Sequence, residues 1–115
     1  MNNARAIQER FLRDALPIRL GGLAANLRRM TSFSRSESNQ AAVAALIDES
    51  KFFIEWTAAE ADIDTAATLV ELQVQLACWE RTWSAIWANP ERRQQLGQEA
   101  RAWSDRVLAL SGLLR

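Results

Sequence analysis

The chain has 115 residues, of which 49% are hydrophobic, and its 14 basic residues balance its 14 acidic residues. A chain of this length predicts one domain, residues 1–115, that can bury a core without disulfides or metals. No apolar run approaches the roughly 20 residues of a membrane span, and the sequence has no histidine, the commonest metal ligand and the usual general base near neutral pH.

The chain begins with a charged stretch, from Met1 to Arg5, in place of the apolar core of a secretion signal. Cys78 is the only cysteine, so no intramolecular disulfide can form, which fits a reducing compartment. Its position beside the apolar row of its segment predicts a small, half-buried side chain. We therefore expect a cytoplasmic protein that makes no contact with membranes.

The balanced charge is unevenly distributed along the chain. Residues 1–35 carry seven arginines and two acids, residues 36–80 carry one lysine and nine acids, and residues 81–115 carry six arginines and three acids. The net charges of the three segments are therefore +5, −8 and +3. The simplest interpretation places oppositely charged helices side by side, and the alternative is a basic surface for an acidic partner.

The first predicted helix spans about residues 4–33, because apolar residues recur there with helical spacing. Its apolar row consists of Leu12, Leu16, Leu20, Leu23, Leu27 and Met30. Pro17 lies inside this segment and does not disturb the phase of the row. Because proline removes one hydrogen bond and clashes with the preceding turn, we predict a helix kinked or split at Pro17, with its two parts nearly in line.

Three further helices are predicted, over about residues 38–59, 63–88 and 90–114. Asp62 or Asp64 suits the N-cap of the third helix. Asn89 and Pro90 suit the N-cap and first position of the fourth. The apolar rows of these helices are Val43, Leu46, Ile47, Phe53 and Ile54; Leu69, Leu72, Leu76, Trp79, Trp83 and Ile86; and Leu96, Ala100, Trp103, Val107, Leu110 and Leu114. Short connections between long helices predict an all-α fold, an antiparallel up-down-up-down four-helix bundle.

Three of the four predicted helices carry more apolar residues than one core needs. The third helix has a second row, Ile63, Val70, Val74 and Ala77. The first and second helices also carry residues off their core faces, and helices that are apolar on two sides are usually covered on both. We predict that a protein interface includes Ile7, Phe11, Ile18, Gly21, Ala25, Phe52 and Trp56. The four-residue spacing of Gly21 and Ala25 would let another helix approach closely.

No group of residues in the sequence has the pattern of a catalytic, metal-binding or phosphate-binding site. Trp79, Trp83 and Trp87 recur every four residues and could form a platform for an apolar ligand or pigment, although packing explains them equally simply, with Glu80 as an acceptor for an indole N–H. The acids lack the spacing of a metal site. The pairs Arg28-Arg29 and Arg92-Arg93 could contact phosphate, but no aromatic residues interleave with them, which favours a solvated face. We expect no catalytic residue, no metal and no cofactor.

Three stretches carry a resemblance to a known group of proteins. They are Leu16 to Ala24, Glu49 to Thr57 and Trp103 to Leu108. They resemble a family of small uncharacterised all-helical proteins of cyanobacterial type. The resemblance spans most of the chain and implies a cytoplasmic location, but no activity and no functional residues.

The leading hypothesis is a non-enzymatic helical interaction protein, which self-associates as a homodimer or docks on a protein partner. One alternative is a binder of a small apolar ligand or pigment on the tryptophans of the third helix. Another is a nucleic-acid-associated factor that uses the arginines of the first helix.

Overall fold

The computed structural model describes residues 2–113, and this part of the chain is helical throughout, as predicted, apart from short connections. Six α-helices and one 3₁₀ turn are present in it: α1 (Asn2–Arg13), α2 (Leu16–Phe33), η1 (Glu37–Asn39), α3 (Gln40–Ala58), α4 (Ile63–Arg81), α5 (Trp83–Ala88) and α6 (Pro90–Ser111).

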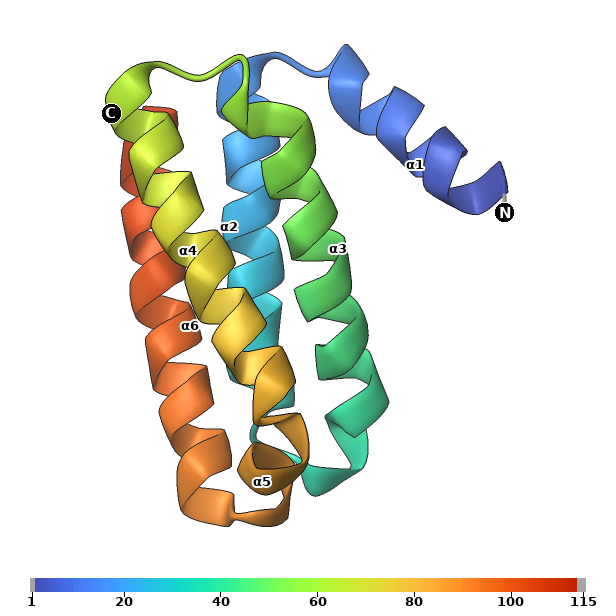
Figure 1. Ribbon diagram of the computed structural model, residues 1–115, viewed down its shortest axis with the longest axis vertical. Coiled ribbons are helices and arrows are strands. Elements are labelled where there is room, and N and C mark those ends of the chain that lie inside the picture. The colour runs from blue at the N-terminus through green and yellow to red at the C-terminus, as the bar shows by residue number, and fades with distance from the viewer. Residues whose placement is uncertain (1, 114–115) are drawn as a thin grey trace.

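The four long helices α2, α3, α4 and α6 run side by side along the molecule (Figure 1). Helix α2 contacts α3 and α6, and α4 contacts the same two helices from the other side. Short helix α5 closes one end, and α1 projects at an angle at the other end, where it contacts α3 (Figure 1). The core between the long helices includes Leu23, Leu27, Val43, Ile47, Leu69, Leu72, Leu76, Leu96 and Val107, all from the predicted apolar rows.

The predicted split of the first helix near Pro17 is confirmed, but its two parts are not in line. Helix α1 ends at Arg13, before Pro17, and its axis does not continue into α2 (Figure 1). Ala15 has an extended backbone, and Pro17 then lies in the first turn of α2, where its missing N–H costs no helical hydrogen bond. Leu12 is consequently exposed, while Phe11, from the opposite side of the predicted helix, enters the core.

The third predicted helix is also divided. Helix α4 ends at Arg81, and Thr82 separates it from α5 with a non-helical backbone (φ −110°, ψ 19°). The Thr82 hydroxyl donates a hydrogen bond to the Cys78 carbonyl (3.0 Å) at the end of α4. The spacing of apolar residues in the sequence did not indicate this break. Residues after the break, Ile86 and Trp87, are still buried, so the apolar pattern continues across it.

The predicted helix starts of α4 and α6 are confirmed. The Asp62 side chain accepts a hydrogen bond from the Thr65 N–H (3.4 Å) and is the N-cap of α4. The Asn89 side chain accepts bonds from the N–H groups of Glu91 and Arg92, with Pro90 next to it. Helix α6 ends at Ser111, before the predicted position of about 114, which lies outside the described residues.

Helices α2 and α6 meet through small residues and hydroxyl groups. The Thr31 hydroxyl donates to the Gly97 carbonyl (2.8 Å), and the Ser104 hydroxyl donates to the Ala24 carbonyl (2.8 Å). The two contacts advance in opposite directions along the two helices, so α2 and α6 are antiparallel. A Cβ atom at position 97 would lie 2.5 Å from the Ser34 Oγ, so any larger residue there displaces the Ser34 hydroxyl, although the Thr31 carbonyl would stay at an ordinary 3.6 Å.

Substitution of the glycines in α2 and α6 tests this contact. Gly97→Ala should lower the free energy of unfolding by about 1–3 kcal/mol, because the added methyl group overlaps Ser34 in a packed contact. Gly22→Ala is the matched control and should raise it by about 0.5–1 kcal/mol, since a Cβ there meets nothing within 4 Å. Urea unfolding followed by circular dichroism measures both changes.

Removal of the Ser34 hydroxyl should recover part of the loss in the Gly97→Ala variant, because the Ser34 Cβ lies at an ordinary 3.7 Å from the added atom. Equal stability of the Gly97→Ala and Gly22→Ala variants would contradict the assignment of Gly97 as a spacing residue.

Candidate interaction surface

Arg19 holds two helix connections together at the end of the molecule where α1 meets α2. It is only 6% exposed, and its Nη1 and Nη2 donate to the two carboxylate oxygens of Glu60 at 2.9 Å each. Its Nε donates to the Asp14 carbonyl (3.0 Å). Asp14 lies between α1 and α2, and Glu60 lies between α3 and α4, so this one guanidinium ties both connections together.

The ion pair shifts the protonation equilibria of both partners. The hydrogen bonds from Arg19, and its positive charge, hold the pKa of Glu60 below its ordinary value. The same hydrogen bonds outweigh desolvation and raise the pKa of Arg19. Both residues are therefore charged at neutral pH, as a buried guanidinium with a bidentate carboxylate partner requires.

Aromatic side chains pack α1 against α3. Phe11 stacks on Phe53 with ring centroids 4.1 Å apart and planes 15° apart. Trp56 contacts both Phe11 and Phe52, with centroids 5.7 and 5.6 Å apart. Phe11 is thus a buried packing residue, and the prediction that it is available to a partner is wrong for its ring.

The structure brings the seven predicted interface residues to one region, here called the N-terminal face and defined as Ile7, Phe11, Ile18, Gly21, Ala25, Phe52 and Trp56. Ile7, Phe52 and Trp56 line a hollow of about 260 Å³ between α1 and α3. The other four residues line a shallow groove of about 560 Å³ over the start of α2. Ile18 and Phe52 present the most apolar surface, with 50% and 44% of their areas exposed.

Gly21 faces its own chain. A Cβ atom at this position would lie 2.8 Å from the Leu113 side chain, so the end of the described chain covers the glycine. The lack of a side chain at Gly21 therefore leaves room for Leu113 of the same chain, and the approach of another helix at Gly21 and Ala25 stays a prediction.

The three tryptophans of the predicted platform are used in packing. Trp79 and Trp87 are buried, and Trp83 is half-buried with its ring 5.1 Å from that of Trp87. The Trp79 indole donates to Glu99 (3.4 Å) and the Trp87 indole donates to the Glu37 carbonyl (2.8 Å). The acceptor predicted in Glu80 is wrong, because Glu80 pairs with Lys51 instead (2.8 Å). These contacts favour packing over a ligand platform.

A second apolar row is exposed on α4. Ile63, Val70 and Val74 expose 87%, 57% and 60% of their areas, although the sequence predicted that a partner or core would cover them. Cys78 follows this row and is exposed, so the prediction of a half-buried thiol is wrong. The row carries no aromatic side chain, in contrast with the N-terminal face.

Comparison with protein-family models, with curated proteins and with solved structures gives no match to this chain. The resemblance to small helical proteins of cyanobacterial type stays a prediction. Among residues 2–113, no helix has the length and hydropathy that a bilayer crossing requires, and no three His, Cys, Asp or Glu side chains lie close enough to share a metal ion.

The Arg19–Glu60 pair predicts a pH-dependent contribution to stability. A carboxylate whose pKa is lowered by folding stabilises the fold at pH values above its ordinary pKa, and this contribution is lost as the pH falls through its folded pKa. Glu60→Gln should therefore lower the urea midpoint most at a pH of about 7, and the difference from the unmodified protein should shrink towards a pH of about 3.

Glu55→Gln serves as the matched control for this experiment. Glu55 is exposed and forms no ion pair among the described residues. The control should leave the urea midpoint nearly unchanged at both pH values. A Glu60→Gln effect that is the same at both pH values would contradict a charged pair as its cause.

Proposed function

We propose that this chain is a non-enzymatic interaction protein that forms a two-fold homodimer through its N-terminal face. The observation that carries the proposal is the half-exposed apolar surface of Ile18 and Phe52, which lie beside two neighbouring hollows. Partly exposed aromatic side chains beside a hollow are typical anchors of protein interfaces.

Charge complementarity supports a second copy of the chain as the occupant. Helix α1 presents Arg10 and Arg13, which are exposed and form no ion pair among the described residues. The neighbouring α3 presents Asp48 and Glu55, which are likewise exposed and unpaired there. In a two-fold contact the same surface meets itself, so the arginines of one protomer can lie over the acids of the other.

The exposed row on α4 is a weaker basis for self-association. It offers small β-branched side chains without an aromatic anchor, and Asp64 at its side would face the same charge in a second copy. This comparison favours the N-terminal face.

The proposed scaffold is an antiparallel up-down-up-down four-helix bundle of α2, α3, α4 and α6, with α1 as an added element that completes the interface. We place the protein in the cytoplasm, where the exposed Cys78 would stay reduced.

The double substitution Ile18→Ser and Phe52→Ser tests the proposed dimer. Light scattering at micromolar concentration should give twice the 13.0 kDa chain mass for the unmodified protein and the chain mass for the variant. Because both side chains are about half exposed, the variant should keep its helical circular dichroism. A chain mass of 13.0 kDa for the unmodified protein would overturn the proposal.

The double substitution Val70→Ser and Val74→Ser on α4 is the matched control, because it removes a similarly exposed apolar pair elsewhere. It should leave the dimer intact. Dissociation by this pair, with no effect of the Ile18 and Phe52 changes, would move the interface to α4. Reversal of Arg10 and Arg13 to Glu should also weaken the dimer, by an amount that shrinks as salt is added.

A further inference from the structure

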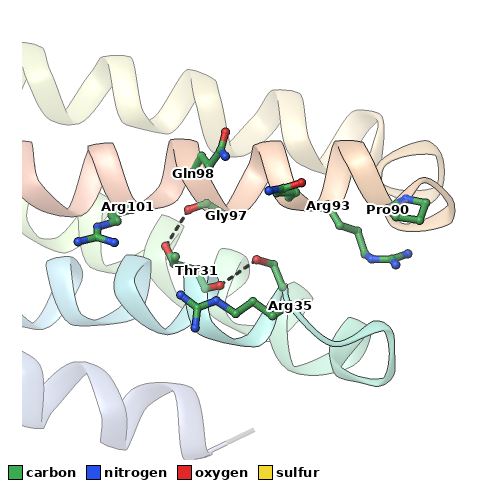
Figure 2. A pocket seen from close by; sticks show the side chains of 9 residues that line it. Thr31, Arg35, Pro90, Arg93, Gly97, Gln98 and Arg101 are labelled. Atoms are coloured by element: carbon green, nitrogen blue, oxygen red, sulfur yellow. Dashed lines mark hydrogen bonds between the residues drawn. The ribbon is translucent and has the colours of Figure 1, made fainter.

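A third hollow lies far from the N-terminal face, between the C-terminal end of α2 and the first half of α6. It has a volume of about 450 Å³ and is shown in Figure 2. Its central contact is the hydrogen bond from Thr31 to the Gly97 carbonyl, flanked by Ser34. Because this contact holds two helix backbones close together, the side chains around it project from fixed positions.

Three arginines line this hollow, which we call the arginine groove, and Arg93 and Arg101 point towards its opposite ends (Figure 2). Arg93 and Arg101 each lie four residues from Gly97, so all three share one face of α6 (Figure 2). Arg35 enters from the chain that follows α2 (Figure 2). The guanidinium of Arg93 is held in place, since it donates to the Trp87 carbonyl and lies 5.7 Å from the centre of the Trp87 ring.

Within residues 2–113, no carboxylate lies at ion-pair distance from the arginines of the groove. No Asp or Glu lines the groove. Arg35, Arg93 and Arg101 form none of the ion pairs found within residues 2–113, which engage Arg5, Arg19, Lys51 and Arg106 instead. Three uncompensated guanidinium groups around one concave site attract anions, and guanidinium binds phosphate with paired hydrogen bonds.

The groove forms where two net-positive segments meet. The charge distribution predicted that oppositely charged helices lie side by side, and the ion pairs Arg19–Glu60 and Arg106–Glu71 follow that pattern. The pair Lys51–Glu80 lies within the net-negative segment. However, α2 and α6, which make the most extensive helix contact, both belong to net-positive segments. For this pair the simple interpretation of the charge pattern is wrong.

We infer that the arginine groove binds a small phosphorylated metabolite with two linked phosphate groups, such as a nucleoside or sugar diphosphate. Its volume lies within the range of about 300–1,000 Å³ typical of small-molecule sites. Arginines spread along the groove suit a ligand with more than one phosphate group better than a single phosphate. The amides of Gln94 and Gln98 in the lining can hydrogen-bond to a sugar or base.

The lining distinguishes this ligand class from nucleic acid. A single-stranded nucleic acid site needs aromatic side chains on which bases stack along an extended track. No aromatic residue lines the arginine groove, and the ring of Trp87 is buried beneath Arg93. The N–H groups of Glu91 and Arg92 at the start of α6 are already bound by Asn89, so the arginines must carry the recognition.

Titration calorimetry with inorganic pyrophosphate and with ADP, at a salt concentration of about 0.15 M, tests the inference. Both probes should bind the unmodified protein one to one, and inorganic phosphate should bind more weakly than either. The Arg35→Gln and Arg101→Gln substitutions should each weaken pyrophosphate binding by about tenfold, the usual effect of one lost charged hydrogen-bond partner. Both arginines are exposed, so circular dichroism should report an unchanged fold.

Arg92→Gln is the matched control, because it removes the same charge one residue from Arg93 on a side chain outside the groove. It should leave the pyrophosphate affinity within about twofold of the original value. No binding of pyrophosphate or ADP at millimolar concentration would overturn the inference. So would an equal loss in the Arg92 and Arg101 variants, or binding of a short oligonucleotide without binding of pyrophosphate.

Discussion

The close contact between α2 and α6 determines the rest of the structure. Two hydroxyl groups, on Thr31 and Ser104, each donate across the helix pair to a backbone carbonyl, and each bond fixes the distance between the two backbones at one point. Only small residues allow this distance, and Gly97 is the position at which even a methyl group would overlap its neighbour. Helices α3 and α4 then complete the core by packing their apolar rows against this pair.

The two ends of α2 handle positive charge in opposite ways. Arg19, near its start, is buried and neutralised by Glu60, so its charge stabilises the connections between helices. Arg35 follows its end, about 24 Å further along at the standard helical rise, and has no carboxylate partner among the described residues. Arginine thus stabilises the fold through an ion pair at the start of α2, whereas at its end Arg35 contributes positive charge without a carboxylate partner.

Short-range patterns in the sequence predicted most of the helices. They could not predict contacts between residues far apart in the chain. Asn89 and Pro90 mark the start of α6 through chemistry within one turn, and the row from Leu69 to Leu76 identifies a core face by its spacing alone. The breaks before Pro17 and at Thr82 leave the apolar spacing unchanged, so periodicity could not reveal them. The pairing of Arg19 with Glu60 joins residues 41 positions apart and has no sequence signature. The spacing of Arg93, Gly97 and Arg101 was a visible signal, but it acquires meaning only beside Arg35 from another element.

Packing of the tryptophans engages two acceptors close in sequence to the arginine groove. Glu99 lies only two residues from Arg101, yet its carboxylate accepts the indole N–H of Trp79 on the α4 side of α6. The Glu37 carbonyl, just beyond Arg35, accepts the indole N–H of Trp87. Each bond satisfies a buried donor that would otherwise destabilise the fold. The Glu99 carboxylate, held by Trp79, therefore lines the hollow on the α4 side of α6, and the lining of the arginine groove contains no acid.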